Sequence, residues 1–220
     1  MSRRRVAVLI SGSGSNLQAL IDAAADPSYP AEVALVISNK ADAYGLTRAQ
    51  NASIPTQVIS HKDFPDRSQF DAAIQKALAE HTIDIVCLAG FMRILTSEFT
   101  QKWFGKMLNI HPSLLPSFKG MHTHQAALDA GVKIHGCTVH FVVPEMDAGP
   151  IVIQAAVPVL PDDTADALGA RVLAAEHQIY PYALKRLCDG TLKLIDGKVS
   201  KSKQAVHEYA LFNPLPNVVK

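Results

Sequence analysis

The sequence predicts an α/β protein built on a mostly parallel, twisted sheet with helices on both faces. Two observations carry this prediction. Short apolar segments alternate with segments of helical periodicity up to about residue 111, an order typical of βαβ units. Residues 83–89 are apolar almost throughout, which is typical of a strand that is covered on both faces.

The elements of this first part follow in chain order. Strands are predicted at residues 5–10, 33–38, 56–59, 83–89 and 107–111. Helices are predicted between them, one capped by Asn16 and running to about residue 25, two at 45–51 and 68–80, and one capped by Thr96 and running to residue 104. Right-handed crossovers place the loops after parallel strands along one edge. The loops at residues 12–16, 90–95 and 111–116 are therefore expected to lie together.

The pattern changes after residue 117. A short helix at residues 123–130 precedes two strands at 136–143 and 151–158, which are expected to extend the sheet as a hairpin. A long amphipathic helix follows at residues 164–187, and Pro181 is expected to kink or break it. Its predicted core contacts are Leu168, Val172, Ile179, Tyr182 and Leu187.

Composition limits the class of protein. The chain has 220 residues, of which 48% are hydrophobic, enough for one domain with a substantial core. The net charge of +1 and the scattered basic residues do not indicate a nucleic-acid partner. No run of about 18 apolar residues occurs, so no membrane span is expected. Three widely spaced cysteines favour a cytoplasmic protein over a disulfide framework.

A glycine-rich loop at residues 12–16 follows the first strand and opens a helix. Free backbone N–H groups at a helix start attract phosphate, and the side chains of Ser15 and Asn16 add donors. The dinucleotide fingerprint would need a glycine where Leu17 stands, and the Walker pattern would need a lysine. A single phosphate is therefore favoured over a pyrophosphate. A tight turn capped by Asn16 is the alternative.

Asn109 and His111 are two residues apart on a predicted strand, so both face the same side of the sheet. An amide can donate a hydrogen bond to a developing oxyanion, and an imidazole can carry a proton near neutral pH. Asp147 could hold that imidazole protonated and oriented if the fold brings the two together. This set suits acyl transfer through a tetrahedral intermediate. The alternatives are a hydrogen-bonded histidine in a turn and an aspartate that serves only the turn beside Gly149.

Two further segments have binding character. Residues 91–95 could line a slot for a flat heterocycle with Arg93 at a polar edge, or simply pack at a helix start. Arg67 beside Asp66 could bind a carboxylate or form a surface ion pair.

No metal site is predicted. Four histidines invite a metal interpretation, namely His122, His124, His135 and His140. Their spacing matches no common zinc pattern, and no cysteine or carboxylate set completes one. His140 is instead expected to face the site from a strand or to lie in the core.

Together these segments resemble phosphoribosylglycinamide formyltransferases from about residue 5 to about residue 195. The matching segments are residues 10–16 (ISGSGSN), 38–42 (SNKAD), 88–95 (LAGFMRIL), 108–116 (LNIHPSLLP), 135–140 (HGCTVH), 147–151 (DAGPI) and 176–181 (EHQIYP). The resemblance implies a single Rossmann-like formyltransferase domain over residues 1–220. Within it we expect a phosphate-binding βα half at about 1–116, a folate and catalytic-loop half at about 117–195, and a tail at 196–220.

The resemblance also implies an activity and a role for each matched position. The enzyme would transfer the formyl group of 10-formyltetrahydrofolate, its co-substrate, to the amine of glycinamide ribonucleotide in purine synthesis, without a metal. Asn109, His111 and Asp147 would be the catalytic residues. Gly14, Ser15 and Asn16 would bind the substrate phosphate, and Glu176 would contact the same substrate. The implied folate contacts are Arg67, Met92, Arg93, Ile94, Leu95, Val143 and Asp147. The Leu115–Pro116 bond is expected to be cis.

Three other activities remain alternatives. A formyltetrahydrofolate deformylase would share the catalytic block but use water as the acceptor, leaving the phosphate loop without a ligand. A methionyl-tRNA formyltransferase would add a tRNA-binding domain and a basic surface. A non-catalytic nucleotide-binding module would need only residues 12–16. The expected partners are small molecules alone, with no nucleic acid or membrane, and the chain is expected to be a monomer or homodimer.

Overall fold

The central feature of the computed structural model is a seven-stranded sheet; the structure describes residues 3–195, 197–199 and 213. The strands are β1 (Arg4–Ile10), β2 (Ala31–Ser38), β3 (Thr56–Val58), β4 (Ile85–Leu88), β5 (Met107–His111), β6 (Ile134–Phe141) and β7 (Ile151–Pro158). Their order across the sheet is β3-β2-β1-β4-β5-β6-β7. Pairing is parallel from β3 to β5 and antiparallel at β5–β6 and β6–β7. The predicted mostly parallel sheet, extended by a hairpin, is confirmed.

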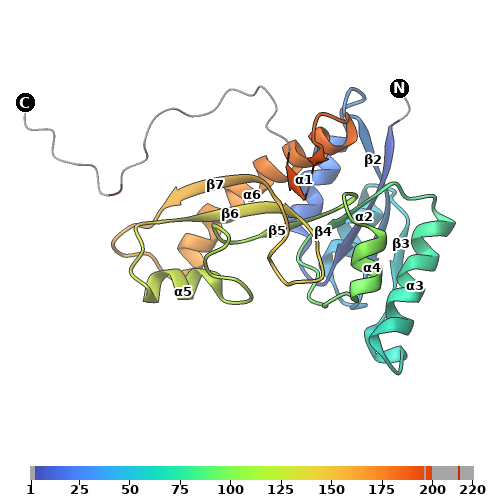
Figure 1. Ribbon diagram of the computed structural model, residues 1–220, viewed down its shortest axis with the longest axis horizontal. Helices are drawn as coiled ribbons and strands as arrows, with labels where there is room; N and C mark the ends of the chain where they lie inside the picture. Colours follow the sequence, from blue (N-terminus) through green and yellow to red (C-terminus); the bar gives the residue numbers. More distant parts are fainter. Residues whose placement is uncertain (1–2, 196, 200–212, 214–220) are drawn as a thin grey trace, which may run out of the picture.

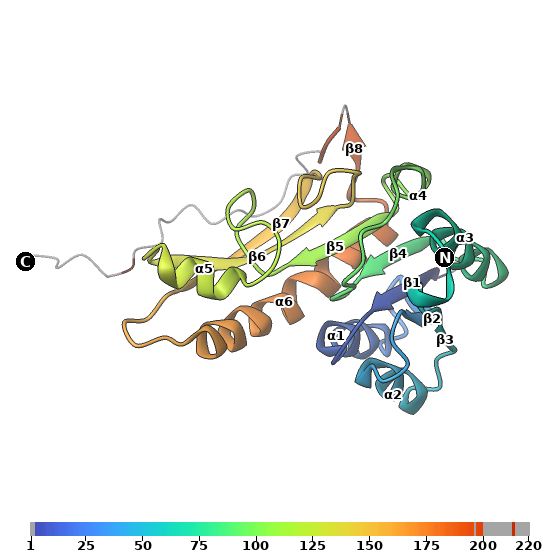
Figure 2. The same cartoon turned by 90° about the horizontal axis from the view of Figure 1, so that it is seen from below.

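Helices cover both faces of this sheet. They are α1 (Ser15–Ala24), α2 (Tyr44–Asn51), α3 (Arg67–Glu80), α4 (Ser97–Lys102), α5 (Thr123–Asp129) and α6 (Ala165–Cys188), with a 3-10 turn η1 (His61–Asp63). Figure 2 shows α1, α2 and α6 on one side of the sheet and α3 on the other, and Figure 1 shows α4 beside α3. A small hairpin of β8 (Leu194–Ile195) and β9 (Lys198–Val199) follows α6.

Two cores result from the alternation of side chains along each strand. In β1, Val6, Val8 and Ile10 join the core shared with α1 and α6, whereas Ala7 and Leu9 join the core shared with α3 and α4. All five side chains are fully buried. Burying a Val, Leu or Ile side chain contributes roughly 1.5–3 kcal/mol, so the two-sided burial of β1 makes it the centre of the fold.

The helix starts show which cap predictions hold. Thr96 caps α4 as predicted, because its Oγ1 accepts a hydrogen bond from the Phe99 N–H at 3.2 Å. The prediction that Asn16 caps α1 is wrong. Gly14 occupies the N-cap position with a left-handed φ of 69°, and Asn16 is the second residue of the helix. Its side chain points instead toward α6, which leaves it available to the site described below.

Helix α6 departs from two expectations. It runs unbroken through Pro181, because its packing on β6, β7 and α1 outweighs the loss of one helical hydrogen bond. Tyr182, predicted to be a core contact, is 41% exposed. Tyr180 is buried in its place and directs its hydroxyl at the Leu88 and Leu108 carbonyls. The buried stripe recurs at every third or fourth residue from Leu168, and Tyr182 does not lie on it.

Three remaining expectations concern the chain as a whole. The Leu115–Pro116 bond is cis, as expected. No helix in the part of the chain that the structure describes is long and apolar enough to cross a bilayer. The tail predicted at residues 196–220 lies outside the described residues except for 197–199 and Asn213.

Candidate active site

The carboxyl ends of β1, β4 and β5 meet at one edge of the sheet, where the sequence placed three loops. These strands are adjacent and parallel. The Met92 N–H donates to Ser11 Oγ at 2.8 Å, which joins the loop after β4 to the loop after β1. The predicted convergence of these two loops is therefore confirmed.

The ladder between β5 and β6 positions three polar side chains. Asn109 lies opposite His140 in the antiparallel register, and His111 lies opposite Thr138. The Asn109 Nδ2 and His140 Nε2 atoms are 3.2 Å apart. Asn109 and His111 therefore share a face with His140, which belongs to the site and not merely to the core.

Asp147 reaches this face from the loop between β6 and β7. Its Oδ1 lies 3.5 Å from His111 Nδ1 and 3.9 Å from His140 Nε2, and its Oδ2 accepts the Gly120 N–H at 2.9 Å. Asp147 itself adopts a left-handed φ of 51°. Its loop also depends on Gly149, where a Cβ would lie 1.7 Å from the Phe141 carbonyl oxygen. The contact between His111 and Asp147, which the sequence could not establish, is present.

The hydrogen bonds of His140 define its tautomer and orient Asn109. His140 Nδ1 lies 2.9 Å from the Phe141 carbonyl oxygen, which can only accept. The proton is thus on Nδ1, and Nε2 accepts from the Asn109 amide. Burial lowers the pKa of His140, against the opposing effects of the Phe141 carbonyl and Asp147. Because the neutral His140 accepts at Nε2, the NH2 group of Asn109, and not its oxygen, faces His140.

His111 faces an acceptor at each ring nitrogen. Its Nε2 lies 3.0 Å from the Phe118 carbonyl oxygen, and its Nδ1 faces the Asp147 carboxylate. Two acceptors suit a doubly protonated, cationic imidazole. The side chain of His111 is 7% exposed and that of Asp147 10% exposed, so both groups are largely shielded from water.

The predicted phosphate loop forms a second polar cluster. Asn16 Nδ2 donates to Glu176 Oε2 at 2.6 Å, and Asn16 Oδ1 has no protein partner. Burial raises the pKa of Glu176, and the bond from Asn16 partly offsets the shift. Arg48, on the neighbouring helix α2, adds a cation to this cluster, since its Nε donates to the Ser13 carbonyl. Sequence reasoning missed this residue. Only the packing of α1 on α2 could have identified it.

Gly14 is required at this loop for steric reasons. Its left-handed φ of 69° is strained for other residues. A Cβ there would also lie 2.6 Å from the Gly45 Cα at the start of α2. The loop consequently places the start of α1, whose free N–H groups attract anions, beside the cation of Arg48.

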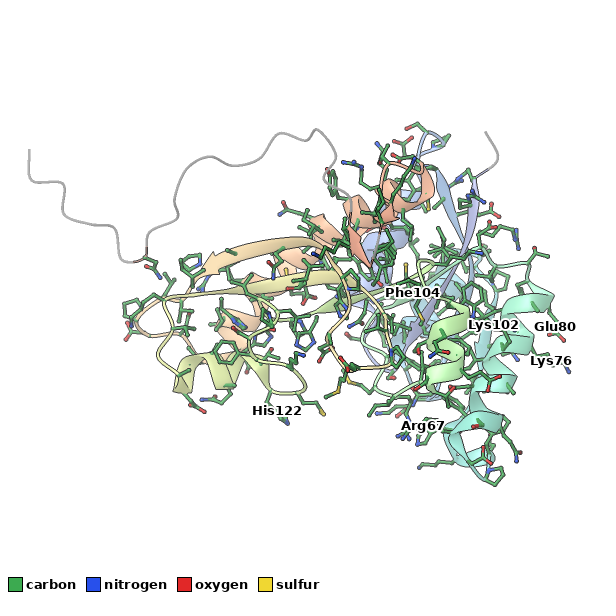
Figure 3. The ribbon with its side chains drawn as sticks, in the orientation of Figure 1. Arg67, Lys76, Glu80, Lys102, Phe104 and His122 are labelled. Atoms are coloured by element: carbon green, nitrogen blue, oxygen red, sulfur yellow. The ribbon has the colours of Figure 1, made fainter. Side chains whose placement is uncertain are left out.

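The segments expected to bind folate are only partly exposed. Met92 and Ile94 are 60% and 56% exposed, whereas Leu95 is buried. Arg93 is exposed and Val143 half-buried. Arg67 is the first residue of α3 and is exposed, and Figure 3 labels it near the lower edge of the molecule. The roles of Arg67, the 92–95 residues and Val143 in binding folate stay predictions.

Among the described residues, no group of three histidine, cysteine or carboxylate side chains is placed to hold a metal ion. His124 Nδ1 and His135 Nε2 are 3.3 Å apart, but no third such group joins them. Burial and then His124 lower the pKa of His135 to about 4. The ring of Phe118 packs edge-on against His135. The observed contacts of the pair thus join α5, β6 and the loop that carries Phe118.

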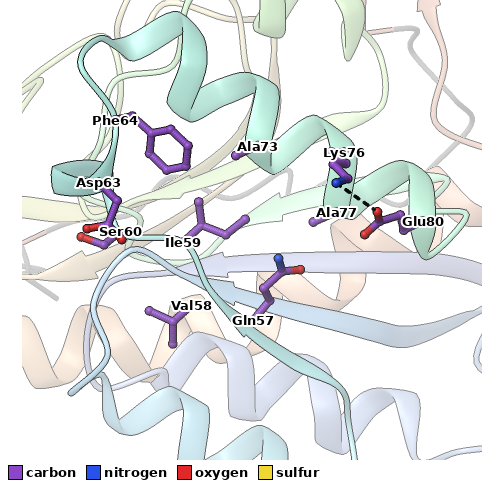
Figure 4. Close-up of a pocket in the computed structure, with 10 residues that line it drawn as sticks. All are labelled: Gln57, Val58, Ile59, Ser60, Asp63, Phe64, Ala73, Lys76, Ala77 and Glu80. Carbon is purple, nitrogen blue, oxygen red and sulfur yellow. Dashed lines mark ion pairs between the residues drawn. The ribbon is translucent and has the colours of Figure 1, made fainter.

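A cavity of about 300 Å³ lies elsewhere, between β3 and α3 (Figure 4). Ile59, Phe64 and Ala77 contribute apolar surface, and Lys76 pairs with Glu80 at 3.8 Å on its wall. The residues that line it include no predicted site residue. The polar groups with acid–base character instead gather at the carboxyl ends of the strands.

Comparisons with known proteins place the chain in a family. The formyl transferase family matches residues 4–184. The phosphoribosylglycinamide formyltransferase of Haemophilus influenzae is 50% identical over 88% of this chain and 91% of that protein. The trifunctional purine biosynthetic protein adenosine-3 of Homo sapiens is 57% identical over 92% of this chain but 20% of that protein. The chain thus spans about a fifth of the length of the human and bovine trifunctional proteins.

Solved structures agree with this placement. Glycinamide ribonucleotide transformylase 1 from Symbiobacterium toebii matches with a TM-score of 0.87 and 47% identity, over 90% of this chain and 93% of that one. A formyltetrahydrofolate deformylase from Pseudomonas syringae is more distant, with 27% identity over 90% of this chain and 65% of that one, at a TM-score of 0.83. The chain belongs to the formyl transferase family, within the phosphoribosylglycinamide formyltransferases.

Proposed function

We propose that this chain transfers the formyl group of 10-formyltetrahydrofolate to the amine of 5-phosphoribosylglycinamide. The products are formylglycinamide ribonucleotide and tetrahydrofolate, and the step belongs to de novo purine synthesis. The observation that carries the proposal is that Asn109, His111 and Asp147 lie close together. Asp147 lies within ion-pairing distance of His111 and of His140. Asn109 lies within hydrogen-bonding distance of His140. The family membership supports it.

The chemistry assigned to this site begins with attack of the substrate amine on the formyl carbon. A C–N bond forms and the carbonyl electrons move to oxygen, so an oxyanion develops. The Asn109 amide, which lies beside His140, and a protonated His111 ring would stabilise that charge. A preorganised donor of this kind typically contributes about 3–4 kcal/mol to the transition state.

Collapse of the intermediate breaks the bond between the formyl carbon and N10 of the folate. N10 is a poor leaving group until it is protonated, and His111 is the group that would deliver the proton, directly or through water. General acid catalysis of this kind contributes about 10²–10⁴ in rate. The attacking amine loses its proton to solvent or to the neutral imidazole left behind. Asp147 balances the charge of His111 before that transfer.

Binding would be divided between two corners of the site. Gly14, Ser15 and Asn16 would bind the phosphate at the start of α1, beside the cation of Arg48. Glu176 would accept from a donor of the same substrate. Arg67, Met92, Arg93, Ile94 and Leu95 would border the folate, whose pterin would contact the backbone of residues 143–147. Nucleic acid and membrane are not among the proposed partners, and the cytoplasmic location and the monomer or homodimer stay predictions.

The decisive experiment measures tetrahydrofolate release by absorbance from 10-formyltetrahydrofolate, with and without glycinamide ribonucleotide. Release that requires the ribonucleotide, with formylated product identified by mass spectrometry, is the expected result. Release at the same rate without the ribonucleotide would replace the proposal with a deformylase. Binding of the ribonucleotide with no release under either condition would favour the nucleotide-binding module.

A further inference from the structure

Residues 90–95 form a loop that is exposed in its middle and fixed near both ends. Met92 and Ile94 present large exposed apolar side chains. The backbone N–H of Met92 donates to Ser11 Oγ, and the N–H of Thr96, just beyond the loop, donates to Asp71 Oδ2 at 2.6 Å. Side chains from two other segments therefore hold the backbone at Met92, where the exposed residues 92–94 begin, and at Thr96, just beyond them.

The first anchor belongs to a buried chain of hydrogen bonds. Ser11 is 5% exposed and Asn39 is 3% exposed. Ser11 Oγ donates to Asn39 Oδ1 at 2.5 Å while it accepts from Met92. Asn39 Nδ2 in turn lies 3.3 Å from His61 Nδ1. The single proton of the Ser11 hydroxyl is committed to Asn39, so its lone pairs face the loop and suit only a donor such as Met92 N–H.

The second anchor is a buried carboxylate. Asp71 lies on α3, is 3% exposed, and has no partner for its Oδ1. Its Oδ2 accepts a hydrogen bond from the N–H of Thr96, the N-cap residue of α4. Burial raises the pKa of Asp71, and the hydrogen bond with Thr96 and the charge of Arg67, one turn earlier on α3, partly offset that shift. Asp71 thus connects the helix that carries Arg67 to the loop that carries Arg93, two residues expected to contact folate.

We propose that Ser11 and Asp71 are positioning residues that fix the 90–95 loop and thereby set the affinity for the folate co-substrate, an inference that rests on the proposed function. Neither side chain needs to touch the ligand. Each restricts the backbone of the loop before folate binds. A loop that is already held in its bound conformation loses less conformational entropy on binding, so the affinity for folate is higher.

The experiment compares Ser11→Ala and Asp71→Ala with two matched variants. Ser38→Ala makes the same change at the end of the adjacent strand β2, where the Ser38 hydroxyl donates to the Lys40 carbonyl and not to this loop. Asp71→Asn keeps an oxygen that can accept the Thr96 N–H. We would measure KM for both substrates, kcat, and the Kd of tetrahydrofolate by calorimetry, with the thermal midpoint as a check on folding.

Loss of either anchor is expected to raise the folate KM and the tetrahydrofolate Kd about threefold to tenfold, the effect of one hydrogen bond. The KM for the ribonucleotide and kcat at saturating folate should stay within about twofold of wild type. Ser38→Ala and Asp71→Asn should resemble wild type. Because the anchors act at opposite ends of the loop, either alanine variant that folds tests the proposal.

Three results would overturn this inference. The folate KM and Kd could remain unchanged in both alanine variants. The KM values of both substrates could rise together, which would indicate general structural damage. Asp71→Asn could lose as much affinity as Asp71→Ala, which would remove the role of the acceptor. If wild type bound tetrahydrofolate but transferred no formyl group, the proposed function would fail while the calorimetric comparison still tested the anchors.

Discussion

Two sheltered carboxylates occupy the two corners of the candidate site, and their surroundings differ. Asp147 faces two imidazoles and accepts the Gly120 N–H. Glu176 accepts one hydrogen bond from a neutral amide, and burial raises its pKa. Both oxygens of Asp147 thus have partners within the protein, one of them an ionisable imidazole, whereas Glu176 accepts from one neutral amide. The difference suggests that Asp147 serves the chemical step and Glu176 serves substrate binding.

The largest expected effect on turnover follows from removal of the His111 imidazole, which lies beside Asp147. We expect His111→Ala to lower kcat about 10³-fold, because the general acid and one stabilising charge are lost together. Single-turnover formyl transfer at saturating substrates measures this effect, with circular dichroism and the thermal midpoint as folding controls. Turnover within tenfold of wild type would contradict the assignment of His111 as the general acid.

Asp147→Asn should produce the next largest effect. The amide keeps the shape of the side chain but removes the charge that balances His111, so we expect kcat to fall about 10²-fold with both KM values nearly unchanged. Glu145→Gln is the matched control, since Glu145 is exposed in the same loop. A large loss of substrate affinity with normal turnover would instead place Asp147 in binding.

Asn16→Ala tests the other corner. We expect the KM for the ribonucleotide to rise about tenfold with little change in kcat or in the folate KM, because binding contacts are lost without loss of the chemical groups. Gln178→Ala, an exposed change on α6 close to Glu176, is the control. A fall in kcat at saturating ribonucleotide would show that the two corners are not functionally separate.

The smallest expected effect is on stability. Glu176 has a pKa above its ordinary value of 4.5 in the folded chain, so the folded state binds protons more tightly than the unfolded state. This contribution to stability is present below pH 4.5 and is lost as the pH rises through the folded pKa. We therefore expect Glu176→Gln to gain thermal stability relative to wild type as the pH rises from 4.5 to 8.

Thermal midpoints of Glu176→Gln and wild type, measured across that range by calorimetry, check the sign. Asp162→Asn is a suitable control, because Asp162 is exposed and should add no such slope. A difference between the two proteins that does not change with pH would mean that Glu176 titrates alike in the folded and unfolded chains, and the contrast with Asp147 would then disappear.

Much of the fold followed from local pattern. Strand β5 occupies residues 107–111 as predicted, and Thr96 caps α4. Both signals are local. The strand is recognised from the alternation of its side chains, and the cap from a hydroxyl that binds the N–H three residues later. The cap assigned to Asn16 was wrong, because Gly14 starts the helix and the Asn16 side chain bonds to Glu176 on α6, which a local pattern does not place. The core position assigned to Tyr182 was wrong because Tyr182 lies off the buried stripe of α6.

The candidate site divides in the same way. The two-residue spacing of Asn109 and His111 was sufficient to put them on one face, and the glycines at 12 and 14 were sufficient to place a turn before α1. His140 joined the site only because the β5–β6 register sets it opposite Asn109. The sequence did not distinguish Ser11 and Asp71 from other polar residues. Only the fold shows that they bind the backbone in and just after the 90–95 loop.

By itself, the sequence determined the alternation of elements, the loop-bearing edge of the sheet and the residue types needed for acyl transfer, because these depend on periodicity and side-chain chemistry. Only the tertiary structure decided that Asp147 lies 3.5 Å from His111 and that Asn16 meets Glu176 across 160 positions of chain. Such contacts depend on strand register, helix packing and a left-handed turn at Asp147. Burial on folding then gives those contacts the electrostatic environment that a sequence alone does not specify.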